Sequence, residues 1–192
     1  MVGRVVVVTG VPGSGKSTVV QEALKQLKAQ DVEYEFMNYG DVMLELMRER
    51  EGVTDRDEMR KVPTGAYREI QREAGKRIAR AAQRKFVLVD THCLIKKPEG
   101  YYPGLPRWVI EELNPESIVI IEATPEEVAR RRAKDTTRRR DKELLDEVVE
   151  HQLLNRATAT AYAALTGATV RIIHNRDGKL SEAVKEMVEV LR

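Results

Sequence analysis

One stretch near the N-terminus has the residue types and the spacing that bind phosphate. Residues 10–17, GVPGSGKS, match the pattern G-x-x-x-x-G-K-[ST] and lie between a β-branched run and a helical pattern. Glycines let backbone N–H groups approach phosphate oxygens, and the start of a helix favours negative charge. We therefore predict a site for a nucleoside triphosphate. Its residues are Gly10, Val11, Pro12, Gly13, Ser14, Gly15, Lys16, Ser17 and Thr18.

Individual side chains of this region have separate expected roles. Lys16 should reach the β- and γ-phosphates and act in catalysis, whereas Thr18 can hydrogen-bond phosphate. The Ser17 hydroxyl should ligate Mg²⁺. Asp90 ends the run FVLVD and should face the metal and its waters, although a turn or N-cap role also suits an aspartate there. The sequence thus predicts ATP and Mg²⁺ as ligands, with Ser17 and Asp90 on the metal side.

Positive charge is concentrated in a second region. The stretch from Arg130 to Lys142 holds eight basic and two acidic residues, although the whole chain carries a net charge of only +2. Such a cluster on a near-neutral protein suggests a small anionic ligand, and a solvated helix face is the alternative. The near-neutral total and the lack of interleaved aromatic residues argue against nucleic acid as a partner.

Short runs of β-branched and aliphatic residues predict the strands that would position these groups. The runs are Val5–Val8, Tyr34–Asn38, Phe86–Asp90, Ser117–Glu122 and Ala168–Ile173. Continuous apolar runs of this length are typical of strands buried on both faces of a parallel sheet.

Helical patterns separate the strands. They are Lys16–Ala29, the apolar face from Tyr67 to Ala81, a helix starting at the capping box Thr124–Glu127, and Leu180–Leu191. Alternation of strands and helices predicts an α/β fold with a parallel sheet, in which ligands bind beyond the carboxyl ends of the strands.

Composition limits the class of protein and the compartment. The 192 residues suffice for one domain, and no apolar run approaches the roughly 20 residues of a membrane helix. We find no signal-peptide pattern. The single cysteine, Cys93, cannot form an internal disulfide or a cysteine-based zinc site, and we expect it to serve packing. We predict a cytoplasmic protein with no membrane partner and no zinc.

The remaining motifs narrow the type of phosphate-binding protein. Asp90–Cys93 is not the D-x-x-G switch of a regulatory GTPase, and Asn175–Gly178 is not its N-K-x-D motif. The chain is also too short for a larger ATPase motor. A small kinase remains, which needs a second anion site and a cationic cover. Residues 40–61 could supply the site, and the arginines of 130–140 could supply the cover.

Seven stretches, in order and over nearly the whole chain, resemble the archaeal-type adenylate kinases. They are VVVTGVPGSGKST (6–18), NYGDVM (38–43), DRDEMRKV (55–62), VDTHCLIKKPEGYYPGLP (89–106), RRRD (138–141), EHQLLNRA (150–157) and LTGATVRIIHN (165–175). The resemblance implies a P-loop NTPase three-layer sandwich with five parallel strands. It implies a helical AMP-binding insert at about 40–66 and a short Arg-rich lid at about 130–141. It also implies the Mg²⁺-dependent reaction ATP + AMP ⇌ 2 ADP and a homotrimer.

The same resemblance assigns residues to AMP and to the lid. Gly40 and Asp41 fall where adenylate kinases approach AMP, and we expect Arg60 to bind the AMP phosphate. Arg138 and Arg140 match the catalytic lid arginines that bridge the phosphates.

Two positions depart from the bacterial and animal adenylate kinases. This chain has Leu44, and Asp146 with Glu147, where those enzymes carry arginines. Arg60 and Arg156 are our hypothetical replacements in the AMP site. We also expect residues 101–106, YYPGLP, to form a rigid turn.

Two other functions stay open at this point. The same core could belong to another nucleoside monophosphate kinase or to a small-molecule kinase, because the phosphate-binding loop contacts phosphates and does not distinguish the base. An RNA-linked NTPase would instead use the arginine cluster for nucleic acid, and would bind RNA in a salt-sensitive way.

Overall fold

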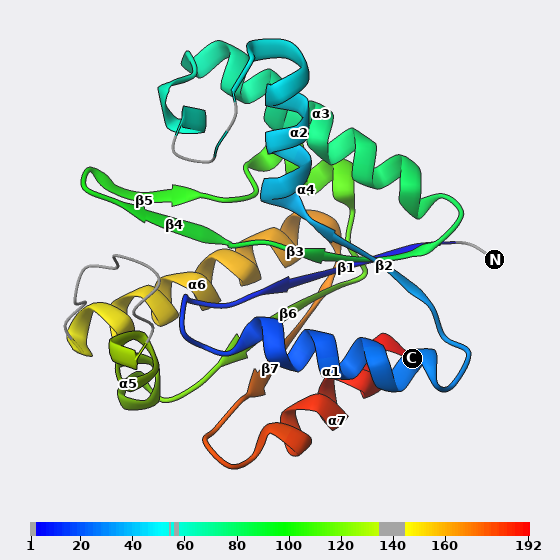
Figure 1. Cartoon of the computed structure of the whole chain (residues 1–192), viewed down its shortest axis with the longest axis vertical. Coiled ribbons are helices and arrows are strands. Elements are labelled where there is room, and N and C mark those ends of the chain that lie inside the picture. The colour runs from blue at the N-terminus through cyan, green and yellow to red at the C-terminus, as the bar shows by residue number, and fades with distance from the viewer. Residues whose placement is uncertain (1–2, 54, 56–57, 135–144) are drawn as a thin grey trace.

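A single parallel sheet forms the centre of the molecule (Figure 1). The computed structural model describes residues 3–53, 55, 58–134 and 145–192. Five strands lie in the order β2-β3-β1-β6-β7, and every neighbouring pair is parallel. Their bounds are β1 Arg4–Thr9, β2 Tyr34–Asn38, β3 Phe86–Asp90, β6 Ser117–Glu122 and β7 Thr169–His174. The five predicted strands and the α/β class are confirmed.

Helices cover both faces of this sheet and make three layers (Figure 1). Their bounds are α1 Lys16–Lys28, α2 Tyr39–Glu51, α3 Thr64–Ala82, α4 Arg107–Leu113, α5 Pro125–Lys134, α6 Leu145–Thr166 and α7 Leu180–Leu191, with a 3₁₀ turn, η1, at Glu58–Lys61. The predicted helices correspond to α1, α3, α5 and α7. Thr124 and Glu127 form the expected reciprocal capping box at the start of α5.

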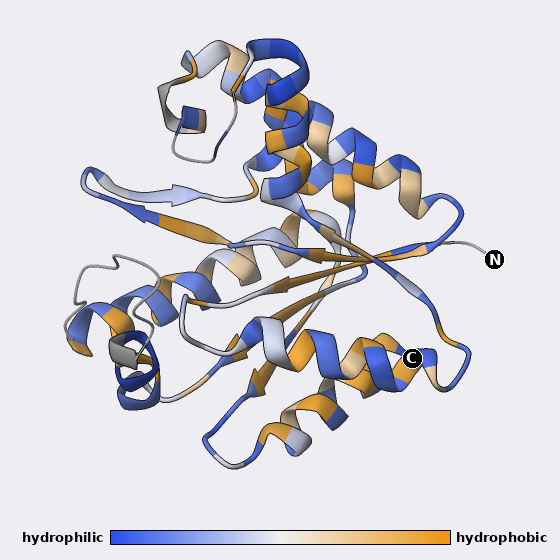
Figure 2. Cartoon of the chain, in the orientation of Figure 1, coloured by the Kyte–Doolittle hydropathy of each residue, from blue (hydrophilic) through white to orange (hydrophobic). Residues whose placement is uncertain are grey.

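Successive side chains of β1 point to opposite faces of the sheet, and both faces are covered by helices. Val5 and Val7 pack into a core with residues of α2, α3, α4 and α6, whereas Val6 and Val8 pack into a second core with α1 and α7. Apolar colour accordingly runs along the central strands and the inward sides of α1 and α7 (Figure 2). A continuous valine run is needed because each successive residue enters a different core.

An antiparallel hairpin outside the main sheet was not predicted. Its strands are β4, Leu94–Lys97, and β5, Gly100–Pro103. The expected rigid turn at 101–106 is therefore wrong for residues 101–103, which lie in β5. The hairpin lies beside α6, to which Lys96 is joined by an ion pair with Glu147 at 2.7 Å.

The AMP-binding insert and the lid stay predictions, and the structure describes part of each segment. The described part of residues 40–66 contains α2 from its second residue, η1 and the first turn of α3, and the apolar side of α2 packs into the α3–α4 core. Of the predicted lid, residues 130–134 end α5, and residues 135–141 lie outside the described residues. Among the described helices, none has both the length and the apolarity to cross a bilayer.

Candidate active site

The phosphate-binding motif forms the connection between β1 and α1. Gly13 and Gly15 have φ angles of 88° and 80°, a region in which residues with a Cβ are strained. Gly10 is constrained by space instead, since a Cβ there would lie 2.5 Å from the carbonyl oxygen of Ile121. The glycines thus allow a tight loop at the carboxyl end of the central strand, directly before a helix N-terminus. That geometry suits an anion.

Lys16 reaches across the sheet edge to Asp90. Its Nζ pairs with Asp90 Oδ1, and both side chains are about nine-tenths buried. The second carboxylate oxygen accepts a hydrogen bond from Asn38 Nδ2 at 2.9 Å. Burial lowers the pKa of Lys16 to about 8. The predicted catalytic lysine and the predicted metal-side carboxylate therefore meet at one point.

The residues present fit a magnesium ion held largely by water and phosphate. Mg²⁺ is usually bound by one or two carboxylates together with substrate phosphates. Asp90 supplies a carboxylate at the end of β3, and Ser17, exposed in the first turn of α1, supplies a hydroxyl next to Lys16. Within the described ranges, no group of three or more His, Cys, Asp or Glu side chains could form a protein-only metal site.

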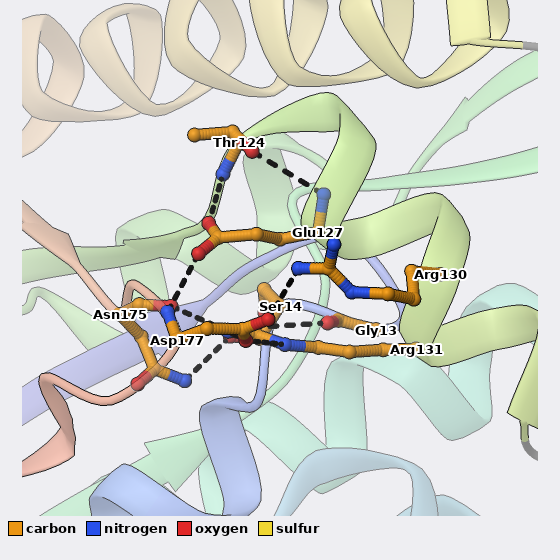
Figure 3. A network of polar contacts seen from close by, with 8 residues as sticks. All are labelled: Gly13, Ser14, Thr124, Glu127, Arg130, Arg131, Asn175 and Asp177. Carbon is orange, nitrogen blue, oxygen red and sulfur yellow. Dashed lines mark hydrogen bonds and ion pairs between the residues drawn. The ribbon is translucent and has the colours of Figure 1, made fainter.

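Arg131 ties α5 to the phosphate-binding loop (Figure 3). Its guanidinium donates to the Ser14 carbonyl at 3.2 Å and to the Asn175 carbonyl at 2.9 Å. It also pairs with the Asp177 carboxylate at 2.6 Å. Asn175 Nδ2 donates to the same Ser14 carbonyl at 2.9 Å. The loop that follows β7 therefore supports the phosphate-binding loop from the side.

Neighbouring arginines of α5 share this arrangement. Arg130 pairs with Asp177, and Arg132 Nε donates to the Pro12 carbonyl at 2.7 Å. Hydrogen bonds from Arg131 and Arg130 lower the pKa of Asp177. The first three arginines of the predicted cationic cover thus bind the loop backbone and an aspartate.

The predicted AMP residues lie on three elements. Gly40 and Asp41 form the first turn of α2, where Asp41 N donates to Asn38 Oδ1 at 3.2 Å. Arg60 lies in η1. Arg156 lies on α6 and forms a two-bond pair with Glu122, whose side chain is 3% exposed at the end of β6. Arg138 and Arg140 lie outside the described residues.

Several site residues were missed by sequence reasoning. Asn38 was absent from the predicted set, although an asparagine before a helical pattern is a recognisable N-cap signal. Asn175 and Asp177 gave no local signal, because their partners are more than 40 residues away. His92 Nδ1 lies 3.2 Å from the Gly10 carbonyl, and Cys93 is fully buried, as expected for a packing residue.

Comparisons with known proteins agree with this geometry. A family model described as "AAA domain" matches residues 9–149. The adenylate kinase of Methanopyrus kandleri is 56% identical over 192 residues, covering 99% of this chain and 98% of that protein. The adenylate kinase of Methanocaldococcus jannaschii is 50% identical and covers all of both chains. Shikimate kinase from Bacteroides thetaiotaomicron superposes with a TM-score of 0.58 at 16% identity, covering 98% of each chain, which shows the shared fold.

Proposed function

The chain belongs to the archaeal adenylate kinases, and on that premise we propose how its residues carry the transfer of a phosphoryl group between ATP and AMP. The enzyme is an ATP:AMP phosphotransferase that catalyses ATP + AMP ⇌ 2 ADP. The observation that carries the proposal is the contact between Lys16 and Asp90 beside the glycine-rich loop. A cation, a carboxylate and a row of backbone N–H groups meet where the strands end.

Lys16 is proposed to balance the charge of the transferring phosphoryl group. In the buried setting of this side chain, a positive charge acts on phosphate more strongly than it does in water. Bound phosphate gives Nζ a second anionic partner besides Asp90. Gly13, Gly15 and their neighbours orient the phosphates through the backbone, while Thr18 adds a hydroxyl at the first turn of α1.

Ser17 and Asp90 are proposed to hold Mg²⁺ together with the nucleotide phosphates. The ion supplies charge neutralisation at the β- and γ-phosphates. Asn38 and Lys16 hold the Asp90 carboxylate in a fixed orientation through its two oxygens. We propose that this chain uses no zinc.

The acceptor is proposed to lie between the α2 N-terminus and the sheet edge. Gly40 and Asp41 contribute the backbone at the α2 start, and Arg60 and Arg156 bind the AMP phosphate. An anionic phosphate attacks without losing a proton to the enzyme, so the site needs no general base. Arg138 and Arg140 are proposed to cover the phosphates during transfer.

An acceptor panel tests the function directly. Mg-ATP is offered with AMP, CMP, UMP or GMP in separate reactions, and ADP formation is followed. We expect rapid turnover with AMP alone. Faster transfer to another monophosphate would show that this nucleotide, and not AMP, is the acceptor. Slow ADP release without any acceptor dependence would point to an NTPase.

A homotrimer and a cytoplasmic location complete the proposal. Family resemblance supports the trimer. Light scattering coupled to gel filtration should give three times the 21.8 kDa mass of one chain. A mass of one or two chains would refute the trimer.

A further inference from the structure

Asn38 lies directly opposite Asp90 in the sheet. The two are register partners at the ends of the parallel strands β2 and β3, and Asp90 is also the register partner of Val8 in β1. Asn38 Nδ2 donates to Asp90 Oδ2 at 2.9 Å, while Lys16 takes the other oxygen. The carboxylate is therefore held by one side chain from the end of β2 and by another from the start of α1.

The other end of the Asn38 amide caps helix α2. Asn38 is the N-cap residue, with φ −84° and ψ 117°, and its Oδ1 accepts the Asp41 N–H at 3.2 Å. A carboxamide donates through nitrogen and accepts through oxygen in one rigid plane. Aspartate can accept but cannot donate when ionised, and serine is too short to span both partners. One side chain thus joins the α2 start to Asp90.

We propose that Asn38 is a positioning residue that fixes the AMP-binding end of α2 relative to the Asp90 carboxylate. The inference rests on the proposed function, because that function places Asp90 on the Mg-ATP side and Asp41 on the AMP side. The two substrates must align in line for transfer, and a displacement of about 1 Å can cost about a hundredfold in rate. Two hydrogen bonds from one amide set that alignment.

Three substitutions of Asn38 distinguish the effect of its bond to Asp90 from the effect of its bond to the Asp41 amide. Asn38→Ser keeps an N-cap and loses the bond to Asp90. Asn38→Asp also keeps the N-cap, but it places a second carboxylate against Asp90. Asn38→Ala removes both bonds. The serine variant is the matched control for the alanine variant, since only the cap differs between them.

The expected result is a split between kcat and the KM for AMP. Loss of the bond to Asp90 should lower kcat about tenfold in Asn38→Ser and about a hundredfold in Asn38→Asp, with the KM for AMP near the wild-type value. Asn38→Ala should lower kcat as the serine variant does and raise the KM for AMP about fivefold, the effect of a lost N-cap. Hydrogen exchange at the Asp41 amide, measured without nucleotide, should quicken in Asn38→Ala alone.

Two results would overturn the inference. One is a wild-type kcat in Asn38→Ser with a wild-type KM for AMP in Asn38→Ala. The other is a parallel change of kcat, KM and melting temperature in all three variants, which indicates a structural role only. Failure of the proposed function is recognised separately, because wild-type protein would then not phosphorylate AMP. The Asp41 exchange pattern and the ¹³C shift of the Asp90 carboxyl would still report whether the amide joins the two elements.

Discussion

Arg131 and Asp177 form an ion pair at 2.6 Å that joins helix α5 to the loop after β7. The same guanidinium also holds the Ser14 carbonyl, so one side chain links three segments at the phosphate-binding loop. Because the guanidinium binds carbonyl oxygens of the phosphate-binding loop, it restricts the orientation of the peptide groups whose N–H groups must face phosphate. We therefore expect Arg131 to preorganise the nucleotide site.

Removing Arg131 should weaken ATP binding more than AMP binding. We expect Arg131→Ala to raise the KM for ATP about tenfold, because the loop loses its bonds to this side chain. Arg130→Ala is the control, since the described contact of Arg130 is with Asp177 alone. Steady-state kinetics with each nucleotide varied in turn provide the measurement. Equal effects of the two substitutions would contradict the role given to Arg131.

Loss of the Lys16 ammonium should abolish most activity without unfolding the protein. We expect Lys16→Ala to lower kcat by about a hundred- to a thousandfold, because phosphate charge is left uncompensated in a buried site. Lys25→Ala, on the exposed last turn of the same helix, should leave kcat unchanged. Circular dichroism confirms that the variants are folded. Full activity in folded Lys16→Ala protein would refute the assignment of this loop.

The Arg156–Glu122 pair predicts a stability effect that is separate from AMP binding. Arg156→Ala leaves the buried Glu122 carboxylate without its partner and should lower the free energy of unfolding by about 1–3 kcal/mol, the exposed guanidinium moderating the loss. Glu122→Gln added to this variant should restore part of that loss. Urea denaturation measures both. If the double variant is less stable than Arg156→Ala alone, the pair is not the cause.

His151 should make the protein sensitive to mild acid. The ring is buried on α6 and faces Tyr101, and its Nε2 donates to the Leu94 carbonyl. Burial, together with Arg132 and Lys96, lowers the pKa of His151. The hydrogen bond to the Leu94 carbonyl and the charge of Glu150 only partly offset this effect. The unfolded chain then binds more protons than the folded one as the pH falls below about 6.5, so stability decreases there.

Denaturation midpoints at pH 7.5 and pH 5.5 test this effect. His151→Gln should lose less stability between the two values than the wild type does. His174→Gln, at an exposed position at the end of β7, should keep the wild-type difference. An equal difference in all three proteins would show that another group causes the acid sensitivity.

Sequence patterns predicted the main sheet because its strands are buried on both faces. The run Val5–Val8 fits a strand of this kind, and its successive residues enter the two cores on opposite faces of the sheet. The β4–β5 hairpin was missed because Lys96, Lys97 and the Gly100–Pro103 stretch carry no buried periodicity. Half-exposed hairpins have weak local signals.

Local motifs located the phosphate-binding loop, but long-range contacts determine its surroundings. The motif itself gave Lys16, and the end of the FVLVD run gave Asp90. No local rule pairs Arg131 with Asp177, 46 residues away, or Arg156 with Glu122. The cationic cover at residues 130–140 was inferred from charge, and Arg138 and Arg140 were assigned from the family resemblance. Charge does not reveal which carboxylate or carbonyl lies near an arginine.

The order of strands has a consequence for synthesis of the chain on the ribosome. β1 contains the first residues of the sheet, yet it is flanked by β3 and β6, and Gly10 lies against the carbonyl of Ile121. Asn175, which holds Ser14, is made later still. Parallel pairing over such sequence distances folds slowly. The phosphate-binding loop is made early, but its site is therefore among the last features that a nascent chain can complete, and nucleotide can stabilise only a nearly finished enzyme.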